Sequence, residues 1–175
     1  MLSDPITLYK LMILYMLKKV KFPITGTQLS EFFLGHEYTT YFTLQQAVSE
    51  LLEAHLIKAE YVNHSSRYEI TDEGEDTLTF FGNKMSGAIV KDINDYLKEN
   101  KVRMRNEVGI LADYTRTDQQ DYRVHGEIRE GKSVLFEMSV SVPTMDQAEA
   151  MCAHFKRSCQ DIYAYAMKEL LREDK

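Results

Sequence analysis

The chain has 175 residues, with 21 Lys and Arg against 27 Asp and Glu, which gives a formal net charge of −6. A chain of this length can bury a core without disulfide bonds, and its supply of apolar and aromatic residues excludes disorder as the main state. Its longest apolar run, Leu11 to Leu17, is too short to span a bilayer, so we expect no membrane partner. The acidic total excludes a protein that coats nucleic acid at large, but it allows one local DNA-binding face.

The chemistry-bearing residues are few and do not form a recognisable active site. Two cysteines cannot make a disulfide framework and no secretory signal opens the sequence, so we expect a cytoplasmic protein. Cys152 and Cys159 stand seven residues apart on an apolar helical stripe, which predicts core positions. No histidine pair has i, i+4 spacing, and Cys152-x-His154 does not close a zinc site. We therefore predict no metal, no cofactor and no catalytic residue, because phosphate-binding, dinucleotide and nucleophile motifs are also missing from the sequence.

The first 81 residues follow a helix, helix, helix, hairpin, helix order. Periodicity and capping residues predict these elements over residues 6–20, 26–34, 41–55, 57–70 and 72–81. A Thr-x-x-Gln capping box at residues 25–28 opens the second helix, and Thr39 or Thr40 caps the third. The first helix is apolar on nearly all sides, so we expect it to pack on its own domain and on the second domain or a partner subunit.

The remaining residues predict a linking helix and a second domain. Periodicity predicts a helix over residues 88–101, followed by a hinge up to residue 105. Alternation then predicts a three-stranded antiparallel meander over residues 108–142. A second capping box at residues 144–147 opens a helix of about 28 residues, roughly 40 Å long, whose end extends beyond the sheet. The predicted division is therefore 1–81, 82–105 and 106–175.

The order of elements in residues 6–81 resembles the winged-helix variant of the helix-turn-helix. Its most specific stretch, Arg67 to Gly74, contains a Tyr-x-Ile-Thr-x-x-Gly run that is similar to the end of the wing in the PadR and MarR groups of bacterial regulators. The fold class implied is α+β, an N-terminal winged helix-turn-helix followed by a three-stranded antiparallel meander packed on one long helix. PadR-like proteins follow the winged helix with helices alone, so their dimer geometry does not transfer to this chain.

The whole chain also resembles a narrower bacterial family of unknown function. The runs that carry this resemblance are Leu11–Leu17, Gln28–Phe33, Tyr41–Gln46 and Asp92–Leu97. Members of that family are described only as regulators without an assigned target, so this resemblance implies an architecture rather than an activity.

The winged-helix resemblance implies a DNA-binding transcriptional regulator that is not an enzyme. In such proteins the third helix enters the major groove and the wing contacts the backbone or the minor groove. Glutamine can pair with adenine, and serine or threonine suits bases or phosphates. The DNA-binding candidates are Thr39, Thr40, Thr43, Gln45, Gln46 and Ser49 on the helix, and Asn63, His64, Ser65, Ser66 and Arg67 on the wing.

Charge leaves a second interpretation open. Residues 1–81 hold six basic against eleven acidic residues, and the third helix has no basic residue but carries Glu50 and Glu53. Neutralisation of phosphates supplies most non-specific DNA affinity, and little is available here. The alternative is a winged-helix protein-interaction module that does not bind DNA. The one dense basic run either reaches phosphates or forms a solvated hinge; its members are Lys98, Lys101, Arg103 and Arg105.

Two further expectations concern partners. The two-sided first helix and the overlong last helix predict a homodimer. The aromatic residues of the C-terminal half either pack simply or line a pocket for a small-molecule or protein effector; they are Tyr114, Tyr122, Phe136, Phe155, Tyr163 and Tyr165. We therefore expect residues 106–175 to form a dimerisation or sensor domain.

Overall fold

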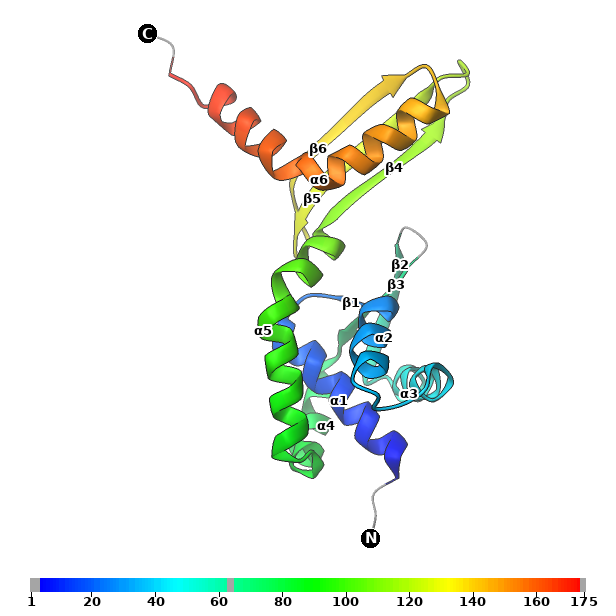
Figure 1. Ribbon diagram of the computed structural model, residues 1–175, viewed down its shortest axis with the longest axis vertical. Helices are drawn as coiled ribbons and strands as arrows, with labels where there is room; N and C mark the ends of the chain where they lie inside the picture. Colours follow the sequence, from blue (N-terminus) through cyan, green and yellow to red (C-terminus); the bar gives the residue numbers. More distant parts are fainter. Residues whose placement is uncertain (1–3, 63–64, 174–175) are drawn as a thin grey trace. The chain divides into compact units, whose positions relative to one another are not determined.

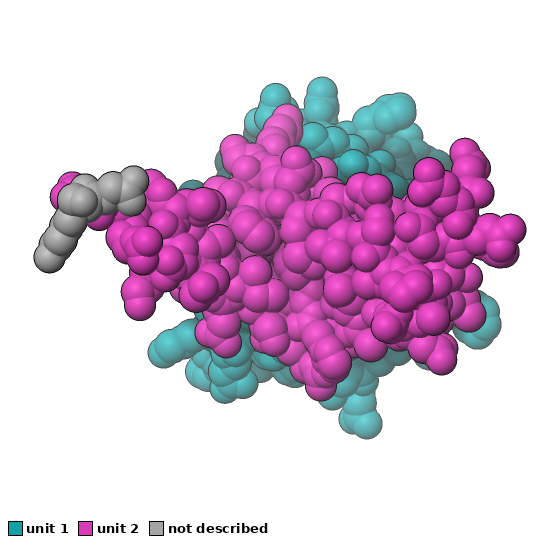
Figure 2. All heavy atoms as spheres, turned by 90° about the horizontal axis from the view of Figure 1, so that it is seen from above, with its two compact units in different colours: residues 1–108 teal, residues 109–175 magenta. Residues whose placement is uncertain are grey.

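The computed structural model describes residues 4–62 and 65–173, and the chain divides into two compact units, residues 1–108 and 109–175, coloured separately in Figure 2. Each unit combines helices with one small three-stranded antiparallel sheet, so the prediction of a mixed helix-and-strand class is confirmed. Among the described residues, the helices are all too short or too polar to cross a membrane.

Unit 1 holds the helix-rich part of the chain (Figure 1). Its elements in order are α1 (Pro5–Val20), β1 (Ile24–Thr25), α2 (Gly26–Gly35), α3 (Tyr41–Glu53), β2 (Ile57–Val62), β3 (Ser65–Ile70), α4 (Asp72–Phe81), the short 3-10 helix η1 (Gly82–Lys84) and α5 (Gly87–Gly109), which ends at the first residue of unit 2.

Helix α1 forms the centre of the unit 1 core. Seven of its residues are buried, and they lie on all sides of the helix. Elements of unit 1 itself cover this surface, since α1 contacts α3, α4 and β3, and Tyr15 bonds to Asn94 of α5. The buried residues of α1 are therefore covered within unit 1, and the second domain that we expected to cover one side of α1 is not needed for this. The physical reason is that α5, which crosses α1, buries Ile93 and Leu97 in the same core (Figure 1).

The sheet of unit 1 has the strand order β1-β3-β2. The hairpin β2–β3 was predicted from the alternation, whereas the two-residue strand β1 was not. Ile24 of β1 pairs with Tyr68 of β3, and both side chains are buried. This pairing attaches the segment that connects α1 to α2 to the β2–β3 hairpin.

Helix α5 is longer than the sequence predicted. Residues 102–105, where we expected a hinge, are helical, and the helix continues through Val108, which we expected to open a strand. Met104 and Val108 are buried because they extend the apolar stripe of α5 toward the end of the helix. The basic run therefore lies on a helix that belongs to unit 1 up to residue 108.

Unit 2 is a three-stranded meander covered on one face by a helix. Its elements are β4 (Ile110–Arg116), β5 (Tyr122–Glu130), β6 (Ser133–Val142) and α6 (Met145–Leu170), with the strands in chain order. Phe155 of α6 packs over Gly126 of the central strand, beside Ile128 and Cys159. The second half of α6 extends beyond the sheet, as its predicted length implied (Figure 1).

Candidate functional site

The outer face of α3 holds most of the predicted contact residues. Thr40, Gln46 and Ser49 are exposed, and Thr39, Thr43 and Gln45 are half-buried. The helix packs through Leu44, Ala47, Val48 and Leu51, as its periodicity predicted. Its exposed side is therefore free of packing within unit 1.

Two of these candidates already have local partners. The Thr40 hydroxyl caps α3 by accepting a hydrogen bond from the Thr43 backbone N–H at 3.3 Å, which makes Thr40 the cap. The Gln46 amide donates to Glu50 Oε1 at 3.1 Å, and Lys10 Nζ donates to Glu50 Oε2 at 2.9 Å. The bond from Lys10 and the bond from Gln46 hold the pKa of Glu50 below its ordinary value. Lys10 therefore supplies a compensating positive charge next to an acidic group of α3.

Two aromatic residues at the start of α3 are more exposed than predicted. The helical period predicts Tyr41 on the same face as the buried Leu44, but Tyr41 is 53 % exposed, and Phe42 is 83 % exposed. Their rings touch edge to face, with centroids 5.9 Å apart. Sequence reasoning missed this pair because it treated the first turn of α3 as part of the core stripe. The packed stripe begins one turn later, at Leu44.

The wing candidates are divided between described and undescribed residues. Asn63 and His64 lie outside the described residues. Ser65 and Ser66 are half-buried on β3. Arg67 Nη1 donates to the backbone carbonyl of Val108 at 2.8 Å, so its guanidinium ties β3 to the end of α5.

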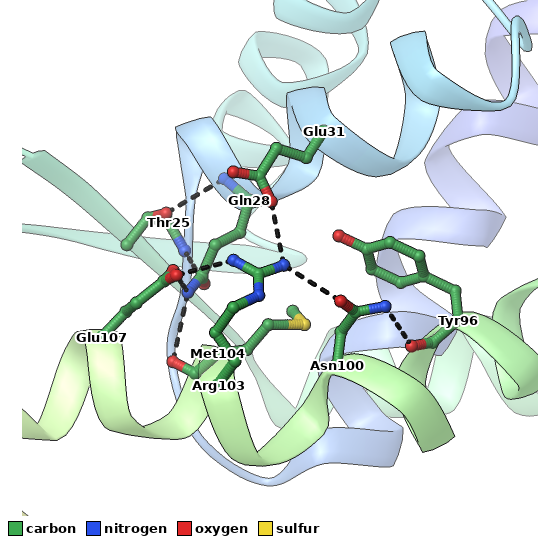
Figure 3. Close-up of polar contacts among 8 residues, drawn as sticks. All are labelled: Thr25, Gln28, Glu31, Tyr96, Asn100, Arg103, Met104 and Glu107. Carbon is green, nitrogen blue, oxygen red and sulfur yellow. Dashed lines mark hydrogen bonds and ion pairs between the residues drawn. The ribbon is translucent and has the colours of Figure 1, made fainter.

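A buried glutamine makes a second connection between α5 and the rest of unit 1 (Figure 3). Gln28 is 1 % exposed, and its Nε2 donates to the Met104 carbonyl at 3.1 Å and to Glu107 Oε2 at 2.7 Å. Its Oε1 accepts from the Thr25 N–H, which completes the capping box of α2. One side chain thus caps α2 and binds α5 at the same time.

Arg103 extends this polar network. Its guanidinium donates to Glu107 at 2.6 Å and to Glu31 of α2 at 3.1 Å (Figure 3). The bond to Glu107 and the bond to Glu31 raise the pKa of Arg103, although partial burial opposes them. Arg103 therefore has two carboxylate partners in unit 1, which accounts for one member of the basic run.

Unit 2 brings together a polar cluster that sequence reasoning missed. His125, Glu127 and Glu137 place one ligating atom each within 4.8 Å of one another. His125 and Glu127 are two residues apart on β5, and Glu137 lies opposite Glu127 on β6. The His-x-Glu spacing on a predicted strand was the available signal, but Glu137 joins only through the strand register.

An arginine compensates the charge of the buried carboxylate in this cluster. Glu127 is buried and accepts from His125 Nε2 at 3.1 Å and from the Arg129 guanidinium. Burial disfavours the ionised form of Glu127, but the bonds from His125 and Arg129 together outweigh it and lower its pKa. The arrangement explains how the Glu127 carboxylate is held in the interior.

The cysteines and aromatic residues of unit 2 serve its packing. Cys159 is buried and Cys152 is half-buried, and burial raises the pKa of both thiols, which disfavours the reactive thiolate. Tyr114 touches Tyr122 edge to face, with ring centroids 6.0 Å apart, and Phe136 touches Tyr163 at 6.1 Å. Tyr165 of α6 is exposed and does not share in this packing.

The two units define a mixed helix-and-strand protein built on two small antiparallel sheets. The chain belongs to the family described as Domain of unknown function (DUF4364), whose model matches residues 9–170. The predicted resemblance along the whole chain to a family of unknown function is therefore confirmed. Neither the curated proteins nor the solved structures contain a match to this chain.

Proposed function

We propose that this protein is a homodimeric DNA-binding transcriptional regulator, and that unit 1 is a winged helix. The observation that carries the proposal is the order α1, β1, α2, α3, β2, β3 together with the sheet order β1-β3-β2. A winged helix has this arrangement of a helix-turn-helix and a hairpin, with the third helix available for the major groove.

The outer face of α3 supports base recognition. Gln46 and Ser49 are exposed one turn apart, and neither takes part in the core. The Gln46 amide donates one hydrogen bond to Glu50, which an adenine edge would replace with two. We assign Thr40 to capping rather than to base contact. Arg67 would have to release Val108 before it could bind a phosphate.

The charge on this face sets an expectation for salt dependence. Helix α3 has no Lys or Arg, so we expect only two or three phosphate contacts, from Lys58 and the α3 amino end. Each neutralised phosphate contributes about −0.9 to the slope of log K against log salt. The slope should therefore be about −1.8 to −2.7, so specific binding should weaken by roughly 12- to 40-fold between 50 and 200 mM salt.

The end of α6 supports the homodimer. Ile162, Tyr165 and Leu170 are exposed apolar residues in the C-terminal half of α6, and this helix extends beyond its own sheet (Figure 1). Leu170→Glu should convert a dimer to a monomer in sedimentation velocity. Gln160→Glu, which adds the same charge at an exposed position of α6, should leave the dimer intact. A wild-type protein that sediments as a monomer would contradict this part of the proposal.

Selection of duplexes from a random DNA library at 50 mM salt tests the function. We expect an enriched motif, a loss of base preference at one position in Gln46→Ala, and unchanged selection in Gln119→Ala. Gln119 is the matched control because it is exposed in the turn between β4 and β5. Folded wild-type protein that enriches no sequence would refute the proposal.

The second candidate function is protein binding through α3, and the exposed pair Tyr41 and Phe42 favours it. Exposed aromatic residues are typical of interaction hot spots. This function predicts that Phe42→Ala abolishes a pull-down partner while DNA selection enriches nothing. DNA binding predicts an enriched motif whether or not Phe42 is present.

A further inference from the structure

A lysine-rich groove of about 830 Å³ lies in unit 1, away from α3 and the hairpin. Its lining comes from the end of α1, from α4 with η1, and from α5, and α1 crosses α5 in unit 1 (Figure 1). Four lysines line it: Lys18, Lys19, Lys21 and Lys101. The sequence places three of them at residues 18–21 and the fourth eighty residues later, so only the fold brings them together.

The charge of this groove is opposite to that of the chain. Its lining contains no Asp or Glu among the described residues, although the chain has 27 acidic residues. Four ammonium groups around one concave surface repel one another, and the concave shape strengthens their combined field. A multiply charged anion is the ligand that this field would attract.

The lysines have little internal compensation. The nearest carboxylate to Lys18 belongs to Glu75, at 3.9 Å, and Lys19 Nζ lies 5.6 Å from the centre of the Tyr15 ring. Within the described residues, Lys21 and Lys101 have no carboxylate within 4.0 Å, and both side chains are exposed. This differs from Arg103, two residues after Lys101, which has two carboxylate partners.

The floor of the groove is apolar. Leu78 and Met85 are buried in the core and reach the groove, and Val90 and the Tyr15 ring complete the floor. Asn83 and Thr79 add neutral hydrogen-bonding groups at its edge. An inorganic anion would not use this apolar surface, whereas a phosphorylated organic molecule would.

The length of the groove also favours an extended ligand. Val90 and Lys101 both line it, and eleven residues of α5 span about 16 Å. A single phosphate is much smaller than this distance, whereas a nucleoside with a chain of phosphates can reach from the apolar floor to several lysines.

We propose that this groove binds a phosphorylated small molecule of the nucleoside polyphosphate class. The phosphates lie among the four ammonium groups, and the base and sugar lie over Tyr15 and the apolar floor. This site is independent of the proposed DNA-binding face, because none of its lining residues belongs to α3, β2 or β3.

Isothermal titration calorimetry on the full chain at 50 mM salt tests this proposal, with ATP, GTP and tripolyphosphate as probes. We expect at least one nucleotide to bind with one site per chain, and to bind at least fivefold more tightly than tripolyphosphate. The double variant Lys21→Gln with Lys101→Gln should weaken that binding at least tenfold. The double variant Lys21→Arg with Lys101→Arg should retain most of the wild-type affinity for the nucleotide.

The matched control is the double variant Lys132→Gln with Lys168→Gln, which removes the same charge from exposed positions of unit 2. It should bind the nucleotide like the wild type. Equal weakening in both double variants, or binding of neither nucleotide, would overturn the proposal. Tripolyphosphate bound as tightly as the nucleotides would overturn the role of the apolar floor. Circular dichroism must report equal folding of all variants.

Discussion

The replacement Gln28→Leu tests whether the polar network in Figure 3 holds α5 on unit 1. Leucine has a similar volume and remains apolar, so the change removes hydrogen bonds without opening a cavity. The lost side-chain bonds are those to the Met104 carbonyl, the Glu107 carboxylate and the Thr25 N–H. The Gln28 side chain makes all three bonds and is 1 % exposed, so water cannot reach this position to replace the lost bonds.

The magnitude follows from these three bonds. A neutral buried hydrogen bond contributes about 1 kcal/mol, and one to a charged group about 1.5–3 kcal/mol. Glu107 keeps its bond to Arg103, which limits the penalty for its lost partner. We expect Gln28→Leu to lower the free energy of unfolding of unit 1 by about 3 kcal/mol.

Urea unfolding followed by far-ultraviolet circular dichroism measures this change. The matched control is Gln147→Leu, because Gln147 has the same capping-box position at the start of α6 but is exposed. Gln147→Leu should lower the free energy of unfolding by less than about 1 kcal/mol. If both replacements lower the free energy of unfolding equally, or if Gln28→Leu lowers it by less than about 0.5 kcal/mol, then the network does not stabilise the fold as argued.

Three further predictions concern packing and ionisation. A Cβ at Gly74 would lie 2.1 Å from the Leu56 carbonyl oxygen, so Gly74→Ala should destabilise unit 1 by more than about 3 kcal/mol in thermal unfolding. Gly87 has open space around it, so the control Gly87→Ala should not destabilise unit 1 in this way. A Cβ at Gly126 would meet the Phe155 ring at 2.9–3.0 Å, and Gly126→Ala should cost unit 2 about 1–3 kcal/mol by calorimetry. The pKa of Glu127 is lowered in the folded state, so its stabilising effect is present above the ordinary value of 4.5 and disappears as the pH falls through the lowered value. Urea unfolding between about pH 6 and 3 should therefore show a steeper loss of stability in the wild type than in Glu127→Gln, and parallel curves would contradict this.

The helices and most strands could be predicted from local signals. Both capping boxes lie where Thr-x-x-Gln predicted them, and the buried residues of α3 and of α6 up to Cys159 follow the helical period. Strand β1 could not be predicted, because two residues carry no periodicity and pair only through Tyr68. The end of α5 was predicted too early, because Val108 fits both an alternating and a helical pattern, and only its burial in unit 1 decides between them.

The candidate sites were less predictable, since they depend on contacts between distant residues. The role of Arg67 could not be inferred, because its partner, the Val108 carbonyl, is a backbone group forty-one residues away. The cluster around Glu127 depends on the register of β5 against β6, which contains an irregularity after Ile128. The lysine groove depends on α1, α4 and α5 meeting in one core, for which the charge pattern offers no signal.

The binding of a selected duplex and its scrambled version, measured by fluorescence anisotropy between 50 and 200 mM salt, tests the central proposal most directly. A winged helix that reads bases through α3 predicts that the selected duplex binds at least a hundredfold more tightly than the scrambled one. It also predicts that Gln46→Ala reduces this ratio by about tenfold, since one bidentate base contact contributes roughly 1–3 kcal/mol. Equal affinity for the two duplexes, or a ratio unchanged by Gln46→Ala and every other substitution on the exposed face of α3, would contradict it.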